Sequence, residues 1–337
     1  MPPSIPSAPL YAAVELGSDS FRLHVARWEG GVLAVAATLN EPIRLGAAIG
    51  HDGNLDAGTA RRALECLRQF RLALAVWDVR AVRVVATAAL RVACNAPAFL
   101  PAAEAAIGHP VEVLGGEEEG RLVYLGVAAA LANEPGGQHE RRLVLDVGSG
   151  STEIAVGRGD TVELVQSYGV GALRQGLAFF RDGIAPAAFD AALASSRSRF
   201  ADAGVLAGAR GWRRAYGASG TVRALFELAG ADAAAGRGAG TADLHALRQA
   251  LVEEGGFLRI AALSSQPARA AQMAGGLTLL LALVEELRIE TLVPVGAGLR
   301  AGVIRELQQR AEQGALQAAL QDASMRNAPD RLYCLPC

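Results

Sequence analysis

Two segments of the sequence place an acid, a glycine and serines in the same order. Residues 15–20 read ELGSDS, and residues 146–151 read DVGSGS. Turns of this kind present several backbone N–H groups to one side, where they can bind a phosphate, and the hydroxyls add further donors. The candidate phosphate-binding residues of the two turns are Gly17, Ser18, Asp19, Ser20, Gly148, Ser149, Gly150, Ser151 and Thr152.

Three acids flank these turns and are candidates for holding a metal ion. Glu15 and Asp146 precede the two turns, and Glu153 follows the second. A carboxylate in this place would lie beside a bound phosphate, where it can hold Mg²⁺ or Mn²⁺ directly or through water. The alternative interpretation is that these acids only accept hydrogen bonds from the N–H groups of the turns.

Residues 115–121 (GGEEEGR) place three acids in the first turn of an expected helix. Acids there complement the helix dipole, and Glu117 with Arg121 forms an expected i,i+4 ion pair. Three consecutive acids exceed what this requires, so one glutamate is a candidate for orienting and deprotonating a water if the turn faces a cleft. Arg91 follows a strand near its carboxyl end, where ligands bind in open α/β sheets. Ser219 and Gly220 form another turn before a helix, whose N-terminus can bind phosphate.

Other motifs in the sequence are incomplete. The segment around Ser219 does not fit the G-x-S-x-G nucleophile elbow. Residues 296–301 (GAGLRA) match the G-x-G-x-x-A dinucleotide fingerprint, but no second strand with a ribose-binding acid follows. The histidines are dispersed without metal-ligand spacing. Cys334 and Cys337 form a C-x-x-C without a second pair, which we interpret as incidental.

The elements that would position these residues occur twice along the chain. Apolar runs at 11–16, 21–28 and 32–38 predict three strands, and runs at 142–147, 152–158 and 162–168 repeat the pattern. Helices are expected over 57–76, 117–131 and 298–312. The repeat predicts a duplicated α/β fold with a cleft between its halves. We expect a first domain at 1–135, a second at 136–313 whose last helix packs back on the first, and a tail at 314–337.

The composition excludes several classes of enzyme. The 337 residues include no lysine, so all 32 basic residues are arginines. A P-loop, a protein kinase and Schiff-base chemistry each need a lysine, and none is expected here. The net charge of −2 gives no basic surface for duplex nucleic acid. No signal peptide and no membrane span is apparent, and four cysteines are too few for a disulfide scaffold, so we expect a cytoplasmic protein.

Six segments, in this order, resemble the Ppx/GppA phosphatase family of exopolyphosphatases and guanosine pentaphosphate phosphohydrolases. They are AAVELGSDSFRLHVAR, ATAALRVACNAPAFL, VEVLGGEEEGRLVYLGV, LVLDVGSGSTEIAVG, YGASGTVRAL and GAGLRAGV. The resemblance runs from residue 12 to about residue 303. It implies two ribonuclease-H-like domains of the actin-like ATPase superfamily facing across a cleft, in the short form without a carboxyl-terminal HD-type region.

The resemblance also implies roles for individual residues. Glu119 would be the glutamate that activates the attacking water, and Arg91 the arginine that grips the phosphate chain. Asp146 and Glu153 would be the metal-associated acids. The chain departs from the usual family pattern at three positions, which are Glu15 for Asp, Asp19 for Asn and Ser149 for Gly.

The leading hypothesis is therefore hydrolysis of a terminal phosphoanhydride of inorganic polyphosphate or of pppGpp, with Mg²⁺ or Mn²⁺ as cofactor. One alternative is a catalytically weak paralogue that binds polyphosphate or a guanosine penta- or tetraphosphate as a sensor. A second is a sugar or acid kinase of the same superfold, which the acidic turn at 117–119 disfavours. The sequence does not decide between polyphosphate and pppGpp, and it leaves a homodimer open.

Overall fold

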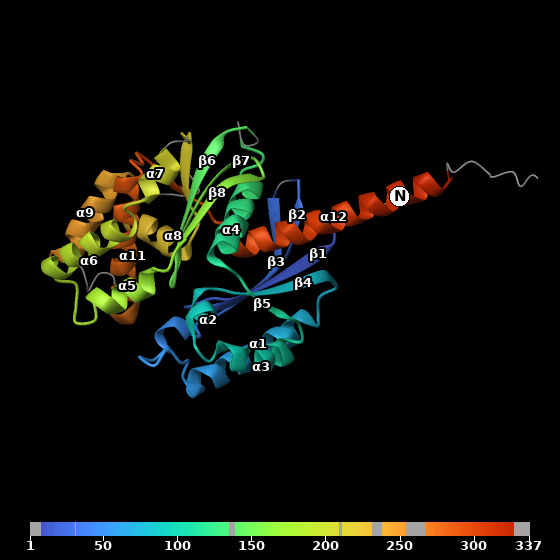
Figure 1. The fold of residues 1–337 in the computed structure, drawn as a ribbon, viewed down its shortest axis with the longest axis horizontal. Coiled ribbons are helices and arrows are strands. Elements are labelled where there is room, and N and C mark those ends of the chain that lie inside the picture. The colour runs from blue at the N-terminus through green and yellow to red at the C-terminus, as the bar shows by residue number, and fades with distance from the viewer. Residues whose placement is uncertain are drawn as a thin grey trace, which may run out of the picture.

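The chain forms two five-stranded sheets with the same strand order (Figure 1). A computed structural model describes residues 8–30, 32–134, 139–208, 211–230, 238–253 and 267–326. The first sheet has the order β3-β2-β1-β4-β5 and the second has the order β8-β7-β6-β9-β10. The strands of the first sheet are β1 (Leu10–Leu16), β2 (Phe21–Glu29), β3 (Val32–Glu41), β4 (Val79–Ala86) and β5 (Val111–Val113). Those of the second sheet are β6 (Arg141–Val147), β7 (Thr152–Arg158), β8 (Thr161–Tyr168), β9 (Arg214–Gly217) and β10 (Leu292–Pro294).

The internal repeat of the sequence is also a repeat of the backbone. In each half the first three strands are antiparallel and the next strand pairs with the first in parallel. The turn after β1 is closed by a hydrogen bond from Gly17 N–H to the Ser20 carbonyl, at 3.2 Å. The equivalent bond after β6 runs from Gly148 to Ser151, at 3.0 Å. The predicted α/β fold of two matching halves is confirmed.

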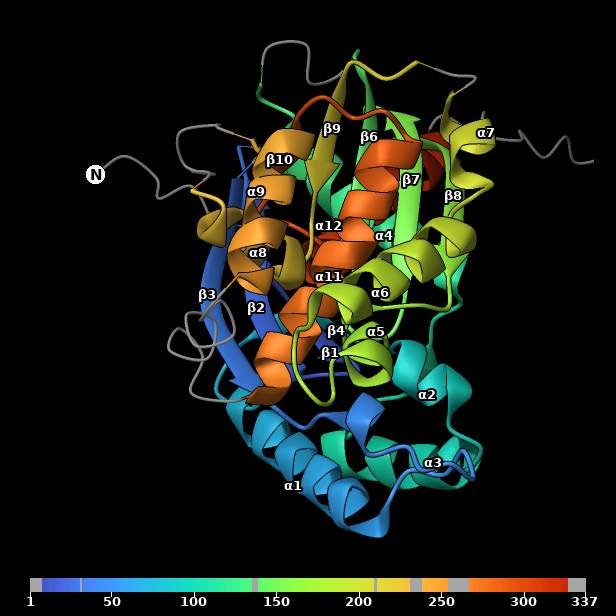
Figure 2. The same cartoon turned by 90° about the vertical axis from the view of Figure 1, so that its left-hand side faces the viewer.

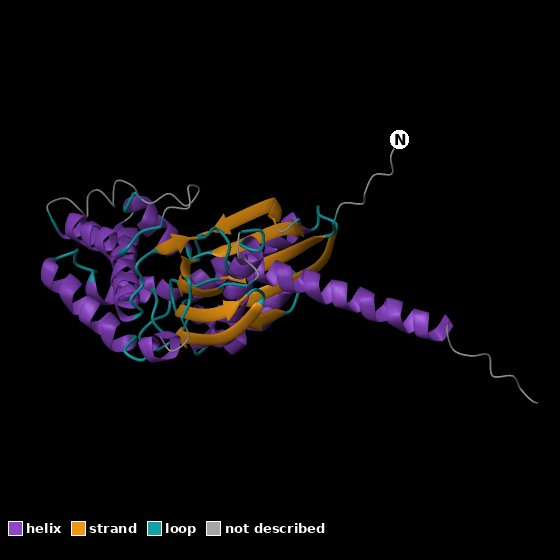
Figure 3. Cartoon of the chain, turned by 90° about the horizontal axis from the view of Figure 1, so that it is seen from above, coloured by secondary structure: helices purple, strands orange, loops and turns teal. Residues whose placement is uncertain are grey.

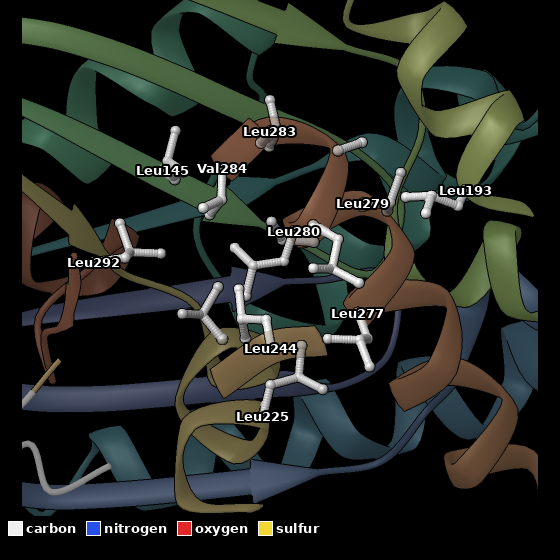
Figure 4. Packing of buried hydrophobic residues seen from close by; sticks show 14 of the residues in the cluster. Leu145, Leu193, Leu225, Leu244, Leu277, Leu279, Leu280, Leu283, Val284 and Leu292 are labelled. Carbon is white, nitrogen blue, oxygen red and sulfur yellow. The ribbon is translucent and has the colours of Figure 1, made fainter. Parts of the chain in front are cut away.

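Helices cover the outer faces of the two sheets (Figure 2). α1 and α3 pack together on the first sheet, while α5, α6, α8 and α9 surround the long helix α11 on the second. In that second core, Leu277, Leu280 and Leu283 of α11 pack among other buried aliphatic side chains (Figure 4). The helices are α1 (Ala57–Leu74), α2 (Ala88–Val92), α3 (Ala96–Ile107), α4 (Gly116–Ala130), α5 (Ala172–Phe179), α6 (Pro186–Arg199), α7 (Ala203–Gly208), α8 (Gly220–Leu228), α9 (Thr241–Val252), α11 (Pro267–Glu286) and α12 (Leu299–Arg326), with a 3₁₀ turn η1 at Leu45–Ala47.

The last helix of each half packs on the sheet of the other half. α4 follows β5 but lies against β6, β7 and β8, whereas α12 follows β10 and lies against β1, β2 and β4. The two helices contact each other between the sheets, where glycines let their backbones approach. A Cβ at Gly126 would come within 2.4 Å of the Gly298 carbonyl oxygen, so this contact requires a residue without a side chain.

α12 is longer than the sequence pattern suggests, because it continues beyond residue 312 to Arg326 and projects from the body of the molecule (Figure 3). The expected domain boundary at 135/136 lies within residues 135–138, outside the described residues, as do Cys334 and Cys337. None of the helices described is both long enough and apolar enough to cross a bilayer.

Candidate active site

The two Gly/Ser turns lie against each other where the halves meet. A Cβ added at Gly150 in the second turn would lie 2.6 Å from Ser18 Oγ in the first. Within the described part of the chain, the N–H groups of residues 18–20 and 149–151 donate no hydrogen bond to the protein. Both turns therefore keep free N–H donors at one place, as an anion-binding nest requires.

Neighbouring backbone holds each turn in its conformation. The N–H groups of Arg44 and Gly46, beside η1, donate to the carbonyls of Asp19 and Ser18, at 2.7 and 2.8 Å. In the second half, the N–H groups of Ala172 and Leu173 in α5 donate to the carbonyls of Gly148 and Ser149, at 2.8 and 3.0 Å. These bonds occupy the turn carbonyls, so the turns expose donors rather than acceptors.

Asp146 and Glu153 face the same side of the second sheet, because they are directly paired across β6 and β7. Ser167 Oγ donates to Glu153 Oε1 at 2.9 Å, and Glu153 Oε2 is buried without a hydrogen-bond partner among the described residues. Burial, followed by the charges of Glu119 and Glu15, raises the pKa of Asp146 to about 7. Burial and the charges of Glu119 and Asp146 likewise raise the pKa of Glu153 well above its ordinary value.

Arg91 connects the acidic turn of α4 to the second Gly/Ser turn. Its guanidinium donates to Glu119 Oε2 at 2.6 Å, to the carbonyl of Leu114 at 2.9 Å and to Ser151 Oγ at 3.2 Å. Burial raises the pKa of Glu119, and the neighbouring Arg91 opposes this by stabilising the carboxylate. The structure thus brings together Glu119, Arg91 and Ser151, which come from three distant segments.

Glycines in α4 allow the acidic turn to reach this position. A Cβ at Gly120 would lie 3.2 Å from Glu153 Cβ, and one at Gly116 would lie 2.1 Å from Ser167 Oγ, so α4 rests directly on β7 and β8. Of the three acids, Glu119 is buried and Glu117 is exposed.

The predicted Glu117–Arg121 pair is wrong. Arg121 instead binds Glu118 at 2.7 Å, and it also binds Glu306 of α12, a carboxylate that Arg83 shares. The tertiary partner on α12 draws the Arg121 side chain away from Glu117 and toward Glu306.

Glu15 is the predicted metal ligand whose surroundings differ most from expectation. Its carboxylate forms an ion pair with Arg300, at the start of α12, instead of lying free in the cleft. Arg22 is the residue paired with Glu15 across β1 and β2, where the second half has Glu153 opposite Asp146. The two halves therefore place different charges at equivalent positions.

Three other predicted phosphate-binding residues have structural contacts of their own. Thr152 is fully buried and its hydroxyl donates to the Val170 carbonyl at 2.7 Å, so it supports the turn and does not face a ligand. Ser219 caps α8 by accepting from Val222 N–H at 2.9 Å, next to the exposed Gly220. Ser20 donates to Asp19 Oδ2 at 3.4 Å.

A pocket of about 440 Å³ opens beside the Arg91–Glu119 pair. Its walls come from both halves, because α4 and β8 both border it. The lining residues are Arg91, Gly115, Gly116, Glu117, Ser167 and Gly169. A ligand entering here would meet the arginine and the N-terminus of α4 directly.

The second half offers two carboxylates as candidate ligands for a divalent cation. The buried Glu153 Oε2 lacks a partner, and Asp146 faces the same side, which suits a hard cation such as Mg²⁺. In the described residues no three acidic, histidine or cysteine side chains gather to bind a metal by themselves. Two carboxylates still fit Mg²⁺, because this ion commonly takes its remaining ligands from water and substrate phosphates.

The matched halves and the pocket between them define a duplicated α/β protein with acidic side chains and an arginine beside its two Gly/Ser turns. The sequence pattern of the Ppx/GppA phosphatase family matches residues 24–311, and the chain belongs to that family. Solved structures agree in fold. The Ppx/GppA enzyme of Aquifex aeolicus is 24% identical with a TM-score of 0.73, covering 88% of this chain and 99% of its own. An exopolyphosphatase of Cytophaga hutchinsonii is 20% identical with a TM-score of 0.77, covering 89% and 98%.

Some residues of the site escaped the sequence reasoning. Arg300 lies in the GAGLRA segment, which matches a nucleotide fingerprint and resembles the family pattern but indicates no role for this arginine. Its ion pair with Glu15 depends on the placement of α12. Ser167 and Gln272 carry no sequence signal, because each reaches the site through tertiary contacts with Glu153 and Ser149, respectively.

Proposed function

We propose that this protein hydrolyses the terminal phosphoanhydride bond of inorganic polyphosphate or of pppGpp. The observation that carries the proposal is the partly buried Glu119–Arg91–Ser151 cluster, placed against a turn with free backbone N–H donors. Family membership supports phosphatase activity in general, and the cluster suggests where the reaction takes place.

The chain's own residues divide the chemistry between two sides of the terminal phosphate. The N–H groups of the two turns and the Arg91 guanidinium would hold the phosphate oxygens and stabilise the charge that spreads over them. Glu119 would accept a proton from the attacking water, and its raised pKa suits a base that works near neutral pH.

Asp146 and Glu153 would hold Mg²⁺ or Mn²⁺ beside these donors. When bound, the ion would neutralise negative charge on the substrate phosphates. A cation there would also offset the repulsion between these two carboxylates, whose pKa values are raised by burial first and then by the charges of neighbouring acids.

The test compares Glu119→Gln with Glu227→Gln, which removes the same charge from the exposed face of α8. Phosphate release would be measured from polyphosphate and from pppGpp, with and without Mg²⁺. We expect Glu119→Gln to lower kcat by about 10²- to 10⁴-fold, as loss of a general base does. Glu227→Gln should stay near wild type, because Glu227 is exposed and does not line the pocket. Near-wild-type turnover in Glu119→Gln, with the fold verified by circular dichroism, would remove Glu119 from the mechanism.

One observation favours a binding protein as the second candidate. The Glu15 carboxylate is engaged by Arg300, so the first half contributes no free acid to the cleft at this position. A sensor would bind polyphosphate or the guanosine phosphates tightly and release no phosphate at any Mg²⁺ or Mn²⁺ concentration. The same assay, run beside an equilibrium binding measurement, separates the two functions.

A further inference from the structure

Ser149 occupies the centre of the second Gly/Ser turn, at the place where Ser18 lies in the first. Both hydroxyl oxygens accept one hydrogen bond from their own half. Ser18 Oγ accepts from Ala89 N–H at 3.1 Å, and Ser149 Oγ accepts from the side-chain amide of Gln272 at 3.1 Å. In the described structure neither hydroxyl donates a hydrogen bond, so both O–H groups remain available.

Gln272 is held in place independently of the turn. It lies on α11, which packs closely against α5, because a Cβ at Gly275 would lie 2.5 Å from the Ala172 carbonyl oxygen. α5 in turn binds the carbonyls of Gly148 and Ser149. The amide donor and the turn backbone are therefore fixed to the same pair of helices, and this fixes the Ser149 side chain relative to its own backbone.

The direction of the Gln272 hydrogen bond determines what Ser149 can do. An amide –NH₂ group can only donate, so the Ser149 oxygen accepts and its hydrogen must point elsewhere. Ser149 and Gln272 are both partly exposed, and the turn has no other described acceptor for this hydrogen. A phosphate oxygen bound at the free N–H groups of the same turn would meet a ready donor.

We propose that Ser149 donates a hydrogen bond to the substrate phosphate and that Gln272 is its positioning residue. This inference rests on the proposed phosphohydrolase function. Ser149 adds to the second turn a side-chain donor that glycine could not supply, and it reproduces the donor that Ser18 places in the first turn. This hydrogen bond would stabilise the bound substrate and the transition state equally, because it holds phosphate oxygens and takes no part in proton transfer.

The experiment measures KM and kcat for polyphosphate and pppGpp in Ser149→Ala, Ser149→Gly, Gln272→Met and the double variant Ser149→Ala/Gln272→Met. A hydrogen bond to a charged group predicts a rise in KM of about tenfold or more for both Ser149 variants, with kcat within about twofold of wild type. Gln272→Met should raise KM in the same direction but add nothing in the Ser149→Ala background, since the two act as one unit. Ser198→Ala, on the exposed face of α6, should leave both constants unchanged.

A KM for Ser149→Ala within twofold of wild type would overturn the inference while leaving the hydrolase function intact. So would additive effects of the two substitutions, because they would give Gln272 a role separate from Ser149. If the wild type releases no phosphate, the proposed function fails, and the same variants are compared by equilibrium binding of polyphosphate. Binding by Ser149→Ala at least tenfold weaker than by wild type would then support the inference, and equal binding, or none by wild type, would overturn it.

Discussion

Glycine can be replaced by alanine at two positions of α12 that have different surroundings, Gly302 and Gly314. A Cβ at Gly302 would lie 1.8 Å from the Leu122 carbonyl oxygen and 3.1 Å from the Gly126 nitrogen in α4, and both are backbone atoms that cannot rotate away. A Cβ at Gly314 would meet nothing within 4 Å. Comparing alanine at the two positions therefore distinguishes the energetic effect of the α4–α12 contact from the intrinsic helix propensity of alanine.

The expected effects have opposite signs. Alanine is favoured over glycine in a helix by about 0.8–1 kcal/mol, and Gly314→Ala should stabilise the protein by up to this amount. At Gly302 the same gain is opposed by overpacking, which costs about 1–3 kcal/mol or more when the helices must separate. The two variants should differ in the free energy of unfolding by about 1–3 kcal/mol, with Gly302→Ala the less stable.

Urea denaturation followed by circular dichroism measures this difference, and the phosphatase assay shows whether it reaches the site. Because α4 carries Glu119, forcing α4 and α12 apart should also lower kcat in Gly302→Ala and leave Gly314→Ala at the wild-type rate. Equal unfolding free energies for the two variants would refute the close helix contact. A stable Gly302→Ala variant with unchanged turnover would also show that catalysis does not depend on the close packing of α4 against α12.

Two further predictions concern the charges of the site. Arg91→Lys should lower kcat/KM by about tenfold or more. The reason is that one ammonium group cannot bind Glu119, Leu114 and Ser151 together as the guanidinium does. Near-wild-type kinetics would argue against this bridging role. Burial raises the pKa of Asp146 from its ordinary value of 3.8 to about 7 in the folded protein. The folded state therefore binds this proton more tightly than the unfolded state does. As a result, Asp146 lowers the free energy of unfolding as the pH rises from about 4 to about 7. In EDTA, Asp146→Asn should therefore be more stable than wild type in urea at pH 8, and this advantage should shrink toward pH 4; a pH-independent difference would contradict the shift.

The strands of this fold could be predicted because each half repeats a strong local pattern. β1, β2, β6 and β7 alternate or are wholly apolar, and Gly/Ser turns end them, so their bounds agree with the structure to within a residue or so. The end of α12 was missed because its apolar stripe fades after residue 312. The helix continues on residues of high intrinsic propensity, such as Ala315 and Leu316, which a pattern of buried positions does not reveal.

The site was only partly predictable, because its parts meet through packing that local sequence does not encode. Glu119 and Ser151 are 32 positions apart in the chain (119 to 151), and Arg91 connects them only because α4 lies on β7 and β8. The wrong choice of Glu117 as the partner of Arg121 has the same origin. Glu306, 185 residues away in sequence, is the residue that orients this arginine.

The two halves share a backbone pattern but differ in charge at the cross-strand pair that precedes and follows each Gly/Ser turn. In the second half this pair is the half-buried Asp146 and the buried Glu153, two acids that suit a cation. In the first half it is Glu15 and Arg22, and Arg300 gives Glu15 a second positive neighbour. A cleft that binds a polyanion through a metal needs an acid pair to hold the cation and a charge-balanced pair opposite it. A second acid pair would repel the phosphates that the cation holds. In the proposed hydrolase, the duplication would supply two similar turns for phosphate oxygens. The divergence at these positions would make the second half acidic enough to hold a metal and leave the first half without a free acid to repel the phosphate chain.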